Sequence, residues 1–217
     1  MRTIVLNQSN ITGNQNNILT YNFPNSVIFK DASIAVSNIT MYYSWFNITA
    51  VMGNNSFSYA WMIGTTLTTY TVNIPDGLYE ISDLNFLLQF NMIQNGTYLI
   101  DANGNNVYFA EFILNPTRYA VQINTYYIPT SLPAGYTQPS NFVGYPTTSQ
   151  NVIVTLPPLF NAIMGYVANF TTDANSGGSF TPPANSQYVS KNAANTISYI
   201  STVAPNVQPN STIVLFK

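Results

Sequence analysis

Three carboxylates lie close together along the chain, and they are the residues best placed to carry acid–base chemistry. Asp76, Glu80 and Asp83 all fall within 76–83. A glycosidase needs two such groups facing each other across a cleft, one as the acid and one as the base or nucleophile. Asp76, however, lies in a Pro-Asp-Gly turn, and Asp83 lies where a helix begins; both positions give the carboxylate a structural role. We therefore predict no catalytic residue and no enzyme activity.

The chain contains no His and no Cys. This removes the commonest general base, the commonest metal ligand, thiolate zinc sites and disulfides. One acidic loop is spaced like a calcium site, with Asp101, Asn103 and Asn105, but Gly104 falls in the wrong place and no Glu follows at the twelfth position. Asn-Gly chemistry favours a hairpin turn there instead. We predict neither a metal site nor a cofactor.

Two further groups have open interpretations. Arg118 follows a strand that carries Glu111, so it could form an exposed ion pair with that residue or contact another subunit, where Arg is favoured. Four tyrosines near a Pro-rich segment could form a sugar-binding platform or an interface, or could pack within the loop itself. They are Tyr126, Tyr127, Tyr136 and Tyr145.

Composition excludes several classes of partner. Five basic and seven acidic residues give a net charge of -2, and charged residues make up 6% of the chain. No basic patch can neutralise a phosphate backbone, so we predict no specific nucleic-acid binding. No apolar run reaches the length of a membrane span. A surface with so few charges lacks the Lys residues that protect sheet edges, so either neighbouring subunits cover it or the composition reflects AT-rich codons.

A single helix is predicted between Ser82 and Asn95, within the stretch 74–96 where the apolar period changes from two to 3.6. Ser82 is the expected N-cap, Leu84, Leu87 and Leu88 follow at helical spacing, and Asn95-Gly96 provides the left-handed stop. The helix is apolar on more than one side. We expect it to lie across a sheet and cover it.

The rest of the chain reads as strands joined by polar turns, with no crossover helices that would indicate a parallel sheet. Long loops are expected over 129–148, as an exposed crossover, and over 171–187, with an N-terminal arm over 1–17 and a short helical turn over 159–164. This pattern of eight to eleven strands indicates an antiparallel sandwich or jelly roll. The predicted strands span 18–23, 27–29, 34–46, 57–63, 67–74, 97–100, 107–114, 118–128, 152–156, 197–203 and 211–216.

The chain resembles the single jelly-roll minor capsid, or penton, proteins of virophages and of related Polinton-like and large DNA viruses. The resemblance covers most of the chain, and its most distinctive part is Ile74-Pro75-Asp76-Gly77-Leu78-Tyr79-Glu80-Ile81 followed by Leu84-Asn85 and Leu88-Gln89. The other segments that carry it are 29–36, 42–48, 95–98, 115–119 with Val121-Gln122, 204–209 and 211–214.

This resemblance implies an all-β fold, an antiparallel eight-stranded single jelly roll (β-sandwich) over 1–217 with one short helix between strands. It implies a structural role without a reaction. The protein would assemble as a homo-pentamer at icosahedral vertices among trimers of a major capsid protein, and would be made in the host cell cytoplasm and located in the virion. The alternative is a carbohydrate- or receptor-binding jelly-roll domain of a viral fibre or lectin.

Overall fold

The computed structural model describes residues 12–15, 18–23, 25–31, 33, 38–41, 46–167, 170–179, 196–206 and 213–216. The chain divides into two compact units. The smaller comprises 1–40 and 214–217, and the larger comprises 41–213. The single domain over 1–217 stays a prediction, and most of the expected arm over 1–17 lies outside the described residues.

Two short pairs of strands are described in the smaller unit and at its boundary with the larger one. β1 (Gly13–Gln15) and β2 (Ile18–Thr20) form an antiparallel hairpin. β3 (Asn38–Met41) pairs with β14 (Ile213–Phe216), so segments near the two ends of the chain are neighbours in one ribbon. The strand expected over 27–29 is not formed. Of the long strand expected over 34–46, residues 38–41 form a strand, residue 46 does not, and the rest lie outside the described residues.

The first sheet of the larger unit is antiparallel, with the strand order β12-β11-β4-β5. β4 (Ser56–Ile63) and β5 (Thr66–Asn73) form a hairpin whose turn begins at Gly64, with a φ of 58°. β11 (Ile153–Leu156) pairs with β4, and β12 (Phe170–Thr171) pairs with β11. The alternating aromatic residues of β4 predicted this strand, and their side chains at 57, 59 and 61 are buried.

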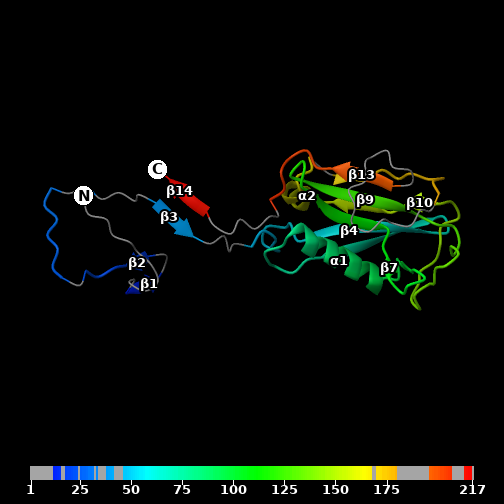
Figure 1. Cartoon of the computed structure of the whole chain (residues 1–217), viewed down its shortest axis with the longest axis horizontal. Coiled ribbons are helices and arrows are strands. Elements are labelled where there is room, and N and C mark those ends of the chain that lie inside the picture. Colours follow the sequence, from blue (N-terminus) through cyan, green and yellow to red (C-terminus); the bar gives the residue numbers. More distant parts are fainter. Residues whose placement is uncertain are drawn as a thin grey trace. The chain divides into compact units, whose positions relative to one another are not determined.

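The second sheet is built around β9 (Ala120–Ile128), as Figure 1 shows. β8 (Ala110–Asn115), β13 (Thr196–Ile200) and β10 (Gln150–Asn151) all pair with β9 antiparallel. Because β10 belongs to this sheet and β11 to the other, the chain changes sheets at Val152. A small hairpin of β6 (Leu99–Ile100) and β7 (Asn106–Val107) precedes β8.

The described residues contain two helices, which corrects the prediction of one. α1 (Ile81–Gln94) is the expected helix, whereas α2 (Pro158–Met164) is a full helix where only a helical turn was expected. Pro158 begins α2 at a position where the missing N–H costs nothing, and Gly165 ends it with a φ of 82°. No helix of the described part of the chain is both long and apolar enough to cross a membrane.

α1 closes the side of the larger unit where the two sheets meet. The side-chain oxygen of Asn85 accepts a 2.9 Å hydrogen bond from the Phe112 N–H of β8, an edge amide that β9 does not use. Near the other end of the helix, the Tyr59 hydroxyl of β4 lies 3.3 Å from the Asn91 carbonyl oxygen. The helix therefore covers the edge strand β8 and reaches β4, rather than lying across one sheet as expected.

The core lies between the two sheets. The ring of Phe57 in β4 contacts Phe112 in β8 and Phe160 in α2, each at a centroid distance of 5.2 Å. Leu84, Leu88 and Met92 of α1 join the same cluster. The mostly β architecture with antiparallel sheets is thus confirmed. The described residues are divided into 14 strand segments, more than the eight expected.

Candidate interaction surface

A groove opens beside the start of α1. Its lining comprises Gly77, Leu78, Tyr79, Asp83, Phe86 and Leu87. Hydrogen bonds from a side chain fix the backbone of the segment before the helix. The Asn47 side chain accepts from the Tyr79 N–H at 2.9 Å and donates to the Tyr79 carbonyl oxygen at 2.8 Å. Asn47 is buried, so these bonds fix the backbone of Tyr79, and with it one wall of the groove, to the interior of the larger unit.

The carboxylates of this region perform the structural roles that the sequence indicated for two of them. Asp76 accepts a 2.7 Å hydrogen bond from the Ala50 N–H, and Asp83 accepts a 2.8 Å bond from the Glu80 N–H. Glu80, not Ser82, is the N-cap of the helix, so that prediction was wrong. A Ser at the second helical position cannot cap, because the chain already has helical geometry there. Within the described residues, no three His, Cys, Asp or Glu residues are grouped so as to hold a metal.

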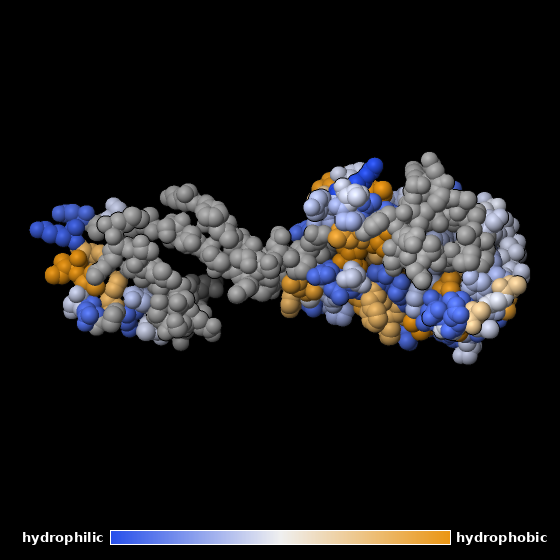
Figure 2. Space-filling view, viewed as in Figure 1, coloured by the Kyte–Doolittle hydropathy of each residue, from blue (hydrophilic) through white to orange (hydrophobic). Residues whose placement is uncertain are grey.

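The outer face of α1 carries an apolar patch, although Ser82, Asp83 and Gln94 of the same helix are exposed as well. Phe86 is 67% exposed and Phe90 is 47% exposed, and their spacing of four residues places them on the same side of the helix. Figure 2 shows hydrophobic surface over this part of the larger unit. The sequence signal for this face was available, since the helix was predicted to be apolar on more than one side; its exposure was not predicted.

Tyr79 provides a neutral hydroxyl to the groove. Burial raises the pKa of Tyr79 above its usual value of 10.0, and the negative charges of Asp83 and Asp76 raise that pKa further. The hydroxyl therefore keeps its proton across the physiological pH range and can donate a hydrogen bond. The groove thus offers apolar side chains, one phenol and the carboxylate of Asp83.

The turn between β8 and β9 is a second exposed feature of the larger unit. Residues 116–119 are exposed, and Arg118 is bonded within the turn only through its N–H, to the Asn115 carbonyl oxygen at 3.3 Å. Tyr119 has a φ of 48° and is 71% exposed. A positive φ is uncommon for a bulky residue, which makes this turn an unusual place for an aromatic side chain.

The expected ion pair between Arg118 and Glu111 is not formed. Arg118 lies in the turn, whereas Glu111 is buried in β8 opposite Asn124, and no ion pair joins the two within the described part of the chain. The Glu111 carboxylate instead accepts from the Tyr126 hydroxyl at 2.6 Å and from the Asn124 side-chain amide at 2.8 Å. That interpretation fails because the register places Asn124, six residues beyond Arg118, opposite Glu111.

Glu111 belongs to a buried polar cluster on β8, β9 and β13. Asn124 accepts from Gln122 and from Ser198, each at 2.8 Å, and Gln122 accepts from Asn115 at 3.1 Å. Burial, followed by the charge of Glu111, raises the pKa of Tyr126 far above its usual value. These hydrogen bonds tie β8, β9 and β13 together inside the sheet.

The tyrosine platform is also corrected. Tyr126 is 2% exposed and belongs to the core, so the four tyrosines do not form one surface. Tyr145 packs within the loop, with its ring 4.7 Å from that of Phe142 and its hydroxyl accepting from Gln138 at 3.0 Å. The alternative of packing within the loop therefore holds for Tyr145.

The long loop over 129–148 contains neither helix nor strand, as predicted, but hydrogen bonds hold it against β4 and α1. The Trp61 indole N–H donates to the Gly144 carbonyl oxygen at 2.9 Å. The side-chain amide of Asn141 donates to the carbonyl oxygens of Ile93 and Gln94 at the end of α1, at 2.9 and 3.2 Å. The loop is thus a cap for the helix rather than a free crossover.

The loop with the calcium-like spacing is a hairpin turn, as predicted. Asp101 accepts from the backbone N–H groups of Asn103 and Asn105, each at 2.8 Å, and Gly104 has a φ of 83°. The hydrogen bonds from Asn105 lower the pKa of Asp101 below its usual value. The carboxylate is therefore occupied in shaping the turn between β6 and β7.

Comparison with protein-family models, curated proteins and solved structures finds no match for this chain.

Proposed function

We propose that this protein is a structural subunit of a viral capsid, a minor capsid or penton protein that assembles as a pentamer at icosahedral vertices. On this proposal its antiparallel sheets form a single jelly roll, its partners are copies of itself and trimers of a major capsid protein, and it resides in the virion. The proposal rests on the resemblance in sequence and on the surface of the larger unit.

The observation that carries the proposal is the exposed apolar face of α1. Phe86 and Phe90 are exposed on the surface. The chain has few charged residues, so electrostatic repulsion between copies is weak. Contiguous exposed apolar surface marks sites of protein–protein contact, and aromatic side chains are enriched at such contacts. Assembly into a shell would cover this face.

The polar groups of the larger unit support the same proposal. Glu111 is engaged by Tyr126 and Asn124, and Asp101 shapes a turn. These carboxylates are thus committed to holding strands and turns in place. Antiparallel sheets in which these carboxylates accept hydrogen bonds within the subunit suit a structural subunit of a capsid.

The test is association of the purified protein, alone and together with the major capsid protein of the same virus. Native mass spectrometry and light scattering should give a pentamer at rising concentration, and the protein should enter particles formed by the major capsid protein. A protein that stays monomeric at every concentration and stays out of the particles would overturn the proposal.

The matched variants are Phe90→Ser and Leu132→Ser. Both side chains are partly exposed, at 47% and 44%, but Leu132 lies in the loop over 129–148 rather than on α1. Phe90→Ser should weaken association at least about tenfold, the effect of losing one well-buried aromatic contact. Leu132→Ser should leave it unchanged.

A further inference from the structure

We infer that neighbouring copies contact each other through two different surfaces: the β8–β9 turn of one copy, with Arg118 and Tyr119, inserts into the groove at the start of α1 of the next copy. This inference rests on the proposed function, because it names the surfaces through which the subunits assemble. The occupant of the groove is therefore a second copy of this chain.

The turn has the chemistry of an inserted element. Arg118 is the only Lys or Arg that the structure describes in the larger unit, and Tyr119 beside it is 71% exposed. Arg and Tyr are, with Trp, the residue types enriched among those that dominate the energy of protein contacts. The positive φ of Tyr119 is a conformation that the chain adopts at a cost, and such outliers cluster where side chains are presented to a ligand.

The groove has the complementary chemistry. Its apolar lining of Leu78, Phe86 and Leu87 can pack against a tyrosine ring, and aromatic pairs add to the energy of burial. The Asp83 carboxylate stands beside this lining and uses one oxygen, Oδ2, to accept from Glu80. Its other oxygen retains acceptor capacity that suits a guanidinium.

Charge favours this pairing in a protein with few charges. Three of the seven acidic residues of the chain fall within 76–83, around the groove, and they are Asp76, Glu80 and Asp83. Arg118 is set in a turn with no ion pair to a described carboxylate of its own chain. A contact between the turn of one copy and the groove of the next would bring these opposite charges together.

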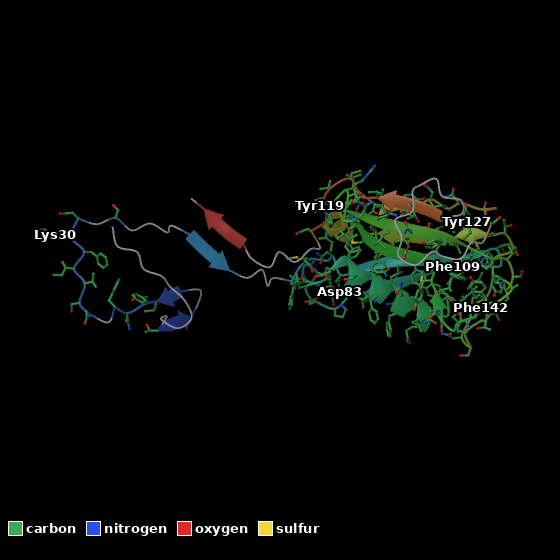
Figure 3. The ribbon with its side chains drawn as sticks, viewed as in Figure 1. Lys30, Asp83, Phe109, Tyr119, Tyr127 and Phe142 are labelled. Atoms are coloured by element: carbon green, nitrogen blue, oxygen red, sulfur yellow. The ribbon has the colours of Figure 1, made fainter. Side chains whose placement is uncertain are left out.

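The positions of the two surfaces suit a ring. Figure 3 shows Tyr119 and Asp83 toward the same end of the larger unit but apart from each other across its width. Because the turn and the groove are different surfaces, each copy can engage one neighbour with its turn and another with its groove. Such a heterologous contact closes into a ring when the rotation between neighbours permits.

The test uses two variants that each remove one surface. Arg118→Glu spoils the turn and leaves the groove intact, whereas Phe86→Gln spoils the groove and leaves the turn intact. Each variant alone should associate at least tenfold more weakly than the wild type. An equal mixture of the two should form heterodimers and nothing larger, because only one of the possible contacts joins an intact turn to an intact groove.

The controls are Lys30→Glu, which makes the same charge change on an exposed residue of the smaller unit, and Leu132→Gln, which removes a partly exposed apolar side chain elsewhere. Both should assemble like the wild type. Thermal unfolding followed by circular dichroism checks that every variant is folded, and native mass spectrometry reads the assembly state.

Three outcomes would overturn the inference, and the first two also separate it from the proposed function. If the wild type assembles and both variants assemble equally well, the contact is wrong while the capsid proposal stands. The same holds if the variants are monomeric but their mixture forms no heterodimer. If the wild type is monomeric and stays out of particles, the proposed function fails and the inference fails with it.

Discussion

The phenol of Tyr126 donates a 2.6 Å hydrogen bond to the carboxylate of Glu111, and both side chains are buried in the second sheet of the larger unit. The residue directly opposite Glu111 in the sheet is Asn124. Tyr126 lies two residues further along β9, so the hydrogen bond joins β8 to β9 diagonally. A carboxylate in this position depends on its donors, because it has no cation beside it among the described residues.

Tyr126→Phe should lower the free energy of unfolding by about 1.5 to 3 kcal/mol, the range for losing a buried hydrogen bond to a charged group. Urea unfolding followed by fluorescence measures it. Tyr145→Phe is the control, because its hydroxyl accepts only from Gln138 in an exposed bond, and it should change stability by less than about 0.5 kcal/mol. Equal effects of the two substitutions would contradict a structural role for the Glu111 pair.

Gly96→Ala should destabilise the protein by at least about 2 kcal/mol, since a non-glycine residue is strained at a positive φ and the added carbon would also clash. Gly96 has a φ of 63°, and a Cβ there would collide with the carbonyl oxygen of Asn141. Gly104→Ala is the matched control, because Gly104 has a φ of 83° but nothing within 4 Å of the added carbon. Gly104→Ala should therefore show the conformational cost alone, about 1 kcal/mol. Thermal and urea unfolding measure the stability of both variants. An equal decrease in the free energy of unfolding for the two variants would refute the packing of the loop against α1.

Asn141→Ala should destabilise the protein by about 1 kcal/mol, the usual cost of leaving the end of a helix without its side-chain partner. The substitution removes the donor for the carbonyl oxygens of Ile93 and Gln94. Hydrogen exchange should speed up at the last turn of α1 and in the loop over 129–148 more than elsewhere. Ser140→Ala, next to it on the exposed side of the loop, is the control. Unchanged exchange in Asn141→Ala would show that the cap contributes nothing.

Stability should fall as the pH rises from 10 to 12, and Tyr59 should account for part of the fall. Burial raises the pKa of Tyr59 from 10.0 to about 12. Above pH 10 the unfolded chain loses this proton while the folded chain keeps it. The stabilisation from the raised pKa of Tyr59 is therefore complete below pH 10. It is lost as the pH rises from 10 to about 12, and the free energy of unfolding falls by about 1.4 kcal/mol per pH unit in this range.

The measurement is the free energy of unfolding in urea at several pH values between 9 and 12. Tyr59→Phe should show a shallower decline than the wild type over this range. Thr97→Val is the control, because it removes the 3.0 Å hydrogen bond to the Tyr59 hydroxyl but keeps the ionisable group. It should be less stable at neutral pH and keep the steep alkaline decline. Parallel curves for Tyr59→Phe and the wild type would refute this assignment.

Local chemistry in the sequence was sufficient for several elements. Alternating aromatic residues predicted β4, Asn-Gly chemistry predicted the turn at 101–105, and Asn95-Gly96 predicted the end of α1, where Gly96 has a positive φ. Each of these features depends on residues that are only a few positions apart. Backbone φ preferences, hydrogen bonds within turns and the alternation of side chains along a strand are all set by such near neighbours. The helix start was placed two residues late because a carboxylate three residues into the helix, not the nearby Ser, bonds the cap N–H.

Only the tertiary structure decided which polar and aromatic residues are buried. Nothing in the local pattern of Tyr126 separates it from an exposed tyrosine. It is buried because β9 lies between β8 and β13, and Glu111, fifteen residues away, supplies the acceptor that its hydroxyl needs there. The loop over 129–148 likewise became a cap because α1, far back in the chain, ends beside Asn141. The sequence by itself determined an antiparallel, charge-poor protein with one strong helix. The pairing of distant segments decided where Phe86, Phe90, Arg118 and Tyr119 remain exposed, because burial depends on what the rest of the chain brings to each surface.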